Sequence, residues 1–146
     1  MIQPHDESND RSRVRMLAVI ERLGEEGLRG RVDETWTASA LLGHMAFWDR
    51  LHLERWKAYA NDGKFDVLPE GFGSSLNDSM LAEWIAISPK KAARLAVAAA
   101  DAIDHWIANL SPEAVEAARA AGRDRLIDRG LHRNAHLDEI ESAYPV

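Results

Sequence analysis

Apolar residues recur along most of this chain at intervals of three and four positions, which is the spacing of one face of an α-helix. The first such stripe falls within residues 8–29 and contains Met16, Leu17, Ile20 and Leu23. Runs that alternate between apolar and polar residues, as half-buried strands do, are nearly absent. The pattern therefore predicts an all-α protein.

Capping residues mark where several of the helices begin. Thr37 precedes the second stripe, and its hydroxyl can accept a hydrogen bond from a free amide of the first turn. Ser88 and Ser111 are each followed by proline, which suits the first helical position because its missing N–H leaves no bond unmade there. The predicted helices span residues 8–29, 38–59, 77–87, 89–110, 112–121 and 124–143, with one long loop at 61–76.

The lengths of these helices indicate how they assemble. Four are long enough to form the body of a bundle, and two are short and lie in the connections. We expect an all-α four-helix bundle of antiparallel neighbours with short additional helices in the connections. Since 146 residues, of which 46% are hydrophobic, suffice for one core, we expect a single domain over residues 1–146.

Cysteine is absent from the chain, and the net charge is −6. Without cysteine there is no disulfide or thiolate ligand, so a metal would be held by His, Asp or Glu, and any thiol would come from outside. The acidic balance argues against nucleic acid as a partner. Four arginines near the C-terminus are interpreted as an exposed, salt-bridged helix face: Arg123, Arg125, Arg129 and Arg133.

No apolar run approaches the roughly 20 residues that span a bilayer, and the N-terminal segment lacks the apolar region of a signal peptide. We therefore expect a cytoplasmic protein with no membrane partner. The tryptophans are interpreted mainly as core residues, with Trp48, Trp84 and Trp106 inside. Trp36 lies just outside a helix start and is expected either to form a hydrophobic staple or to line an opening. The chain has more Trp and Leu residues than one small core is expected to need, so we expect a homodimer.

The stretch LHRNAHLDEI at residues 131–140 places two histidines four positions apart. On a helix this spacing puts His132 and His136 on one face, close enough to share a metal ion. His44 is the candidate third ligand, because it lies on the packing face of the second predicted helix. Each histidine also has a plainer interpretation, as a core residue bonded to a carbonyl or as part of a solvated face, and spacing alone does not decide.

Other polar residues near these histidines have weaker cases. Glu139 lies one turn past the pair and could orient a ligand or act as a base, although a solvated glutamate is the commoner case. His52 lies two turns past His44, about 12 Å along the axis, and could line the same cleft without binding the same ion. His105 is expected to be packed or exposed, and His5 to belong to a disordered N-terminal segment.

Two of these stretches resemble a known family. WTASALLGHMAFWDR at residues 36–50 is similar to the second-helix signature of the DinB/YfiT-like superfamily, and HRNAHLDEI at 132–140 is similar to its last-helix signature. In architecture the resemblance covers essentially the whole chain, but only these two motifs are specific. It implies a four-helix bundle in which His44, His132 and His136 hold one divalent metal ion.

The resemblance also implies a class of activity. Members of the superfamily resemble thiol-dependent transferases and isomerases that use bacillithiol or mycothiol, or metal-dependent hydrolases. Nitrogen ligands suit zinc, nickel, copper or iron better than magnesium or calcium, and we expect zinc or nickel. The implied function is a metal-dependent enzyme that acts on a small electrophilic substrate by thiol transfer or hydrolysis. The alternatives are a non-catalytic bundle that binds or sequesters a small molecule, and a structural bundle whose histidines hold no metal.

Overall fold

The computed structural model describes residues 2–146 of the chain. In this part there are six α-helices and one short 3-10 turn, and the only bridge between extended segments is an isolated one. The elements are α1 (Pro4–Leu28), α2 (Ala38–Asp62), α3 (Phe72–Ala86), α4 (Pro89–Ala108), α5 (Pro112–Ala120), the turn η1 (Asp124–Leu126) and α6 (Gly130–Ala143). The prediction of an all-α protein is confirmed. None of the helices in these residues is both long and apolar enough to cross a membrane.

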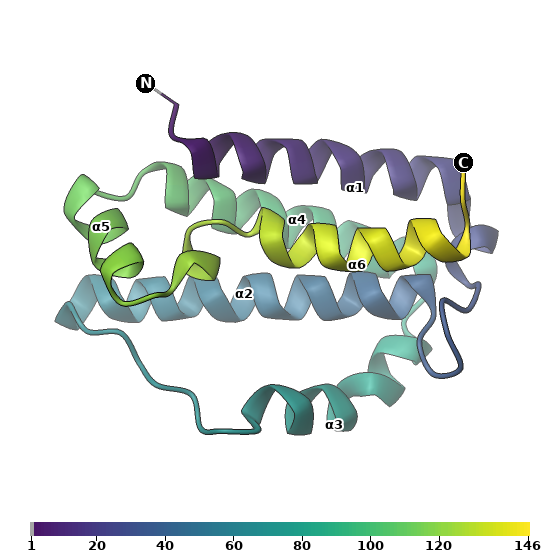
Figure 1. The fold of residues 1–146 in the computed structure, drawn as a ribbon. Coiled ribbons are helices and arrows are strands. Elements are labelled where there is room, and N and C mark those ends of the chain that lie inside the picture. Colours follow the sequence, from purple (N-terminus) through teal and green to yellow (C-terminus); the bar gives the residue numbers. More distant parts are fainter. Residues whose placement is uncertain (1) are drawn as a thin grey trace.

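Helices α1, α2, α4 and α6 lie side by side (Figure 1). Helix α4 packs against α1 and α2, whereas α6 packs closely on α1 and less closely on α2. Helix α3 lies outside this group, beside α2, and α5 with η1 lies at one end (Figure 1). The looser packing of α6 on α2 leaves room between them for polar side chains.

The directions of these helices differ from the expected antiparallel order. Helices α2 and α4 run the same way, as do α1 and α6, and the two pairs oppose one another (Figure 1). In agreement, the early residues of α2 and α4 share one apolar cluster and their later residues share another. The chain crosses back along α2 through a loop and α3, which lets α2 and α4 be parallel. The antiparallel expectation is therefore wrong for the neighbours α2 and α4 and for the neighbours α1 and α6, although α1 and α4, and α2 and α6, are antiparallel.

Side-chain caps fix the starts of three helices, as the sequence predicts. The hydroxyl of Thr37 accepts a hydrogen bond from the amide of Ala40 at 3.0 Å. Ser88 and Ser111 accept in the same way, at 3.2 and 3.1 Å, from the amides three residues further on. A cap of this kind contributes about 1 kcal/mol to stability.

The apolar interior has two parts. The first lies where α1, α2, α4 and α6 meet and includes Met16, Leu41, Leu42, Met45, Leu137 and Ile140. Buried alanines of α4, including Ala92, Ala96 and Ala100, belong to the same part, and their small side chains let α2 and α4 approach closely. The second part lies at the other end of these helices and includes Trp56, Ile103, Ile107 and Leu126.

Tryptophan burial follows the sequence interpretation only in part. Trp84 is buried as expected, but Trp48 and Trp106 are half-buried, and Trp56, not expected inside, is 1% exposed. The indole N–H of Trp56 donates to the carbonyl of Leu126 at 2.7 Å, which satisfies its one polar atom. That carbonyl belongs to the turn η1, whose position no periodicity reveals.

The last helix begins later than predicted. The turn η1 occupies the predicted first turn, and α6 starts at Gly130. The side-chain oxygen of Asn9 in α1 accepts hydrogen bonds from the amides of Arg129 and Gly130, at 2.7 and 3.1 Å. The lack of a side chain at Gly130 favours this close contact, because a Cβ there would crowd the hydroxyl and carbonyl oxygens of Ser8. Helix α1 therefore holds the start of α6.

The N-terminal segment is helical from Pro4, so the expected disorder around His5 is wrong. His5 is buried, with its Nδ1 3.3 Å from a guanidinium nitrogen of Arg119 in α5. This contact joins residues more than a hundred positions apart, which local sequence cannot indicate. Helix α3 also begins earlier than predicted, at Phe72, and shortens the long loop.

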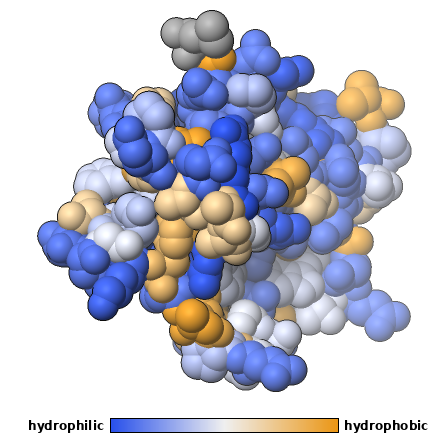
Figure 2. Space-filling view, turned by 60° about the vertical axis from the view of Figure 1, so that its left-hand side comes forward, coloured by the Kyte–Doolittle hydropathy of each residue, from blue (hydrophilic) through white to orange (hydrophobic). Residues whose placement is uncertain are grey.

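The surface carries hydrophobic residues only in small patches on the face that Figure 2 shows, separated by hydrophilic residues. The exposed large apolar side chains include Val14 and Leu17 of α1 and Leu131 of α6. Most of the large apolar side chains in the described residues are thus at least partly buried.

Candidate metal centre

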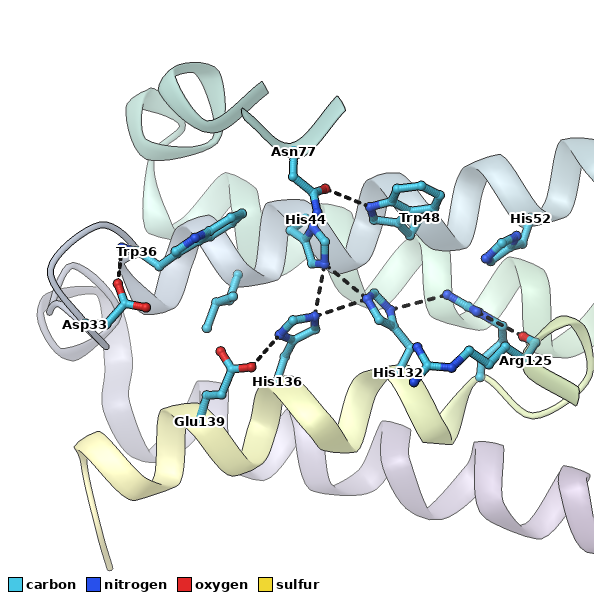
Figure 3. A pocket seen from close by; sticks show the side chains of 12 residues that line it. Asp33, Trp36, His44, Trp48, His52, Asn77, Arg125, His132, His136 and Glu139 are labelled. Atoms are coloured by element: carbon cyan, nitrogen blue, oxygen red, sulfur yellow. Dashed lines mark hydrogen bonds and ion pairs between the residues drawn. The ribbon is translucent and has the colours of Figure 1, made fainter. Parts of the chain in front are cut away.

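Three histidines from two helices converge on one point. His44 lies in the early part of α2, and His132 and His136 lie on α6 (Figure 3). The Nε2 atom of His44 is 3.1 Å from that of His132 and 3.0 Å from that of His136. The Nε2 atoms of the α6 pair are 3.1 Å apart. The structure therefore brings together the three residues that the sequence selects as candidate ligands.

These three contacts cannot all be hydrogen bonds. A ring nitrogen of a neutral imidazole is either a donor or an acceptor, so among three mutually close nitrogens at least two are of the same kind and repel. A cation at the centre removes this conflict, because each nitrogen then directs its lone pair at the ion. Nitrogens bound to tetrahedral zinc at about 2.0–2.1 Å lie about 3.3 Å apart, close to the separations in this cluster. The donor set therefore fits a divalent metal.

A buried ion network sets α6 against α2 in this register. Arg129, the residue just before α6, and Arg133 of α6 share the carboxylate of Asp49 on α2, at 2.8 and 3.1 Å. Arg133 also binds both carboxylate oxygens of Asp104 on α4, each at 2.8 Å. Because the network joins three helices through short charged contacts, it places the α6 histidines opposite the α2 histidine.

The interpretation of an exposed, salt-bridged arginine face is wrong: two of the four arginines are buried, and neither Arg123 nor Arg125 forms a salt bridge with a residue of the described range. Arg129 and Arg133 are 1% and 0% exposed, whereas Arg125 is exposed. Their counter-charges, Asp49 and Asp104, lie on other helices rather than on the same helix face. Charge spacing within one segment does not reveal such partners.

Burial keeps the histidines neutral near pH 7, which is the form that binds metals. Burial, with a smaller effect of His136, lowers the pKa of His44 from 6.5 to about 3. Burial also lowers the pKa of His132, and the nearby charge of Arg129 lowers it further. Glu139 opposes the effect of burial on His136, but the pKa of this histidine is still lowered.

The other ring nitrogen, Nδ1, has a different neighbour in each histidine. A carboxylate oxygen of Glu139 is 3.3 Å from Nδ1 of His136, close but not aligned as a hydrogen bond. A guanidinium nitrogen of Arg129 is 3.4 Å from Nδ1 of His132. Because arginine only donates, this contact favours the tautomer with the proton on Nε2, so metal binding through Nε2 of His132 requires that proton to leave this atom. Nδ1 of His44 has no hydrogen-bond partner in the described residues. Metal-bound histidines usually direct Nδ1–H at an acceptor, so Glu139 is the side chain here that favours the ligating tautomer.

A cavity of about 510 Å³ opens beside the three histidines. Its size suits a small molecule. Besides the histidines, its lining includes aromatic, acidic and basic side chains, among them Asp33, Trp36, Trp48, His52, Arg125 and Glu139.

Tryptophans form much of the apolar wall of this site. The rings of Trp36 and Trp84 lie 5.5 and 5.2 Å from the ring of His44, both edge-on. The indole N–H of Trp48 donates to the side-chain oxygen of Asn77 at 3.1 Å, which ties α3 to α2 beside the cavity. Trp36 thus lines an opening, which is one of the two roles expected from its position before the second helix.

The remaining candidates divide into residues at the cavity and residues away from it. His52 lines the cavity, as predicted, while His105 is exposed on α4. Asn77 and Arg129 also line it, and sequence reasoning missed both. The three-residue spacing between Arg129 and His132 is a signal that places them on one face. Asn77 carries no such signal, since its hydrogen-bond partner lies 29 positions earlier.

These observations define a class of protein, namely an all-α fold with a three-histidine cluster able to hold a divalent metal ion. A family model described as the DinB superfamily matches residues 8–138. The chain therefore belongs to the DinB superfamily, which confirms the resemblance of its two motifs. No curated protein and no solved structure matched the chain.

Proposed function

We propose that this protein binds one divalent metal ion, zinc or nickel, through the Nε2 atoms of His44, His132 and His136. The observation that carries this proposal is the triangle of ring nitrogens 3.0–3.1 Å apart, whose mutual contacts a cation would satisfy. Neutral imidazoles suit zinc and nickel better than magnesium or calcium. Membership of the DinB superfamily supports the same assignment.

The proposed activity is that of a metal-dependent enzyme that acts on a small electrophilic substrate by thiol transfer or hydrolysis. A metal ion in such a site lowers the pKa of a bound water or thiol toward neutrality. Because the chain has no cysteine, the thiol of a transfer reaction is an external low-molecular-weight cosubstrate. The cavity of about 510 Å³ beside the histidines supports a small substrate.

The side chains around the cavity have separate roles in this proposal. Trp36 and Trp48 pack against the apolar part of the substrate and exclude water from it. Glu139 acts as a positioning residue for His136 through Nδ1. Glu139 also lines the cavity, and it is the candidate proton acceptor of the site.

A second candidate function is non-catalytic binding or sequestration of a small molecule. The aromatic wall of the cavity favours it, since binding alone requires that wall and not a metal-activated nucleophile. Turnover assays with a panel of thiols and model electrophiles, run with and without zinc or nickel, separate the two candidates. Saturable binding without turnover in all of them would favour the binding protein.

Metal analysis of purified protein without an affinity tag tests the metal site. We expect about one equivalent of zinc or nickel in the wild type. His44→Ala and His132→Ala should both lose tight binding while circular dichroism shows unchanged helix content. His105→Ala removes an exposed histidine and should keep the metal. Full metal content in His44→Ala, or none in the wild type at micromolar metal near pH 7, would contradict the proposal.

Three wider expectations also remain proposals. Helices α1, α2, α4 and α6 form the four-helix bundle of the superfamily, which their shared apolar cluster supports. Residues 1–146 make up one domain, so thermal unfolding should be a single cooperative transition by circular dichroism and calorimetry. A cytoplasmic location is expected from the sequence and is tested by fractionation.

A further inference from the structure

The cavity beside the histidines is electrically asymmetric. In Figure 3, Asp33 and Glu139 lie on one side of the three histidines, and His52 and Arg125 lie on the other. The carboxylate of Asp33 accepts hydrogen bonds from two backbone amides, at 2.7 and 2.6 Å. The acidic side is therefore partly satisfied by hydrogen bonds within the protein.

Arg125 is the cation of the basic side whose charge the protein does not balance. Its neighbour Arg129 is bound to Asp49 at 2.8 Å, which compensates that charge inside the fold. Arg125 is exposed at the cavity, and its guanidinium forms no salt bridge with any residue of the described range 2–146. Arg125 lines the same cavity as His52, and both lie on the same side of the three histidines (Figure 3).

His52 offers a hydrogen-bond donor on the same side. A guanidinium nitrogen of Arg55 is 3.2 Å from Nδ1 of His52, and because arginine only donates, Nδ1 accepts. The one proton of the neutral ring is therefore on Nε2. Burial, with the charges of Arg129 and Arg55, lowers the pKa of His52 to about 2, so the ring stays neutral near pH 7.

The charge and shape of this side fit a carboxylate. In the metal-free protein, one uncompensated guanidinium and one neutral N–H match a single negative charge, whereas a dianionic phosphate would bring one charge without a partner. A guanidinium also matches the planar carboxylate with two parallel hydrogen bonds. The ring of Trp48 lies 5.9 Å from that of His52, so an apolar surface adjoins the donors.

We propose that the His52–Arg125 side of the cavity binds the carboxylate of a small organic acid, with the apolar part of the acid against Trp48. This inference deepens the proposed function by naming the substrate class of the same cavity. It rests on that function for the reaction but not for the binding, because neither Arg125 nor His52 is one of the three candidate ligands.

Calorimetric titration of metal-free protein with phenylacetate tests the site, with phenylacetamide as the neutral counterpart. We expect phenylacetate to bind saturably and about tenfold or more tightly than the amide, because it makes charge-assisted hydrogen bonds. Arg125→Gln should weaken phenylacetate by about tenfold and leave the amide unchanged. Arg50→Gln removes an exposed arginine of α2 and should change neither affinity.

His52 provides a second pair of variants. His52→Gln keeps a side-chain N–H and should bind phenylacetate nearly as the wild type does, whereas His52→Leu should bind several-fold more weakly. Circular dichroism of every variant confirms that the helices are intact. Equal affinity in the glutamine and leucine variants would remove His52 from the site.

Four results would overturn the proposal: no saturable binding of phenylacetate at millimolar concentration, equal binding of the amide, no effect of Arg125→Gln, or tighter binding of phenylphosphonate than of phenylacetate. The two proposals fail separately. If the protein binds no metal but Arg125-dependent binding persists, the metal site fails and the carboxylate site stands. If metal binds but Arg125→Gln leaves the affinity for phenylacetate unchanged, only the proposal of a carboxylate site is wrong.

Discussion

At the scale of single residues, the three ring nitrogens share one centre, but the residues behind them differ in charge. The carboxylate of Glu139 lies 3.3 Å from Nδ1 of His136, and the guanidinium of Arg129 lies 3.4 Å from Nδ1 of His132. A carboxylate strengthens a histidine as an electron donor, and a cation weakens it. His136 is therefore expected to be the stronger donor of the α6 pair.

Glu139→Gln tests this difference. Removing the negative charge behind His136 should weaken zinc binding by about tenfold to a hundredfold, because the ring loses the partner that favours Nδ1–H. Competition with a chromogenic chelator measures the affinity. Asp138→Asn is the matched control, since Asp138 is a neighbouring exposed carboxylate paired with Arg15. Equal affinities in the two variants would show that Glu139 has no part in metal binding.

His52 makes the stability of the fold depend on pH. Its pKa falls from 6.5 to about 2 in the folded protein, with burial as the largest cause. Between these values the unfolded chain binds a proton that the folded protein does not, so the free energy of unfolding falls as pH falls below about 6.5. The loss from this one group is at most about 1.4 kcal/mol per pH unit.

Urea unfolding of metal-free protein at pH 7, 6 and 5 measures this dependence. His52→Gln should lose less stability than the wild type over that range, because the variant has no such proton to bind. His105→Gln, which replaces an exposed histidine, should follow the wild type. Parallel slopes for the wild type and His52→Gln would contradict the expectation.

At the scale of elements, α6 meets α2 and α4 through buried charges as well as through apolar contacts. Arg133 binds Asp49 and Asp104 while 0% exposed, and Arg13 of α1 also reaches Asp104, at 2.8 Å. The pKa of Asp104 is raised by burial against the opposing effect of Arg133. Each buried charge of the network is therefore stabilised only while its oppositely charged partner is present.

Arg133→Met tests the network. It would leave two buried carboxylates short of a partner, which is expected to lower the free energy of unfolding by about 3–5 kcal/mol. Arg50→Met, at an exposed arginine of α2, should change it by less than about 0.5 kcal/mol. Urea denaturation measures both, and zinc affinity should fall with stability in the first variant alone. A small effect of Arg133→Met would mean that apolar packing alone positions α6.

Much of this element-scale structure could be predicted from the sequence, and the failures share a cause. The caps at Thr37, Ser88 and Ser111 were predictable because each depends on atoms three residues away. The histidine pair was recognisable from its spacing. The late start of α6 depends on Asn9, 120 positions before its partner, and no local pattern encodes such a contact. The parallel run of α2 and α4 is equally non-local.

At the scale of the whole molecule, the expected homodimer remains a prediction. Val14 and Leu17 lie one turn apart on α1 and are 68% and 49% exposed, so they form a candidate contact face. Sedimentation equilibrium at micromolar concentrations should give about twice the chain mass of 16.3 kDa. Val14→Glu with Leu17→Glu should restore the single-chain mass. A wild-type mass of one chain at every concentration would exclude the dimer.

The separation of His44 from His132 along the chain, 88 positions, has a consequence for how the protein reaches its native state. The contacts of α6 with α1 and α2 close loops of similar length, and closing long loops slows folding. We expect α6 to dock last, so that pulsed hydrogen exchange protects amides of α2 and α4 before those of α6. A metal ion that joined His44 to the α6 pair would act after this last step. It would lower the rate at which α6 undocks more than it would raise the rate at which α6 docks.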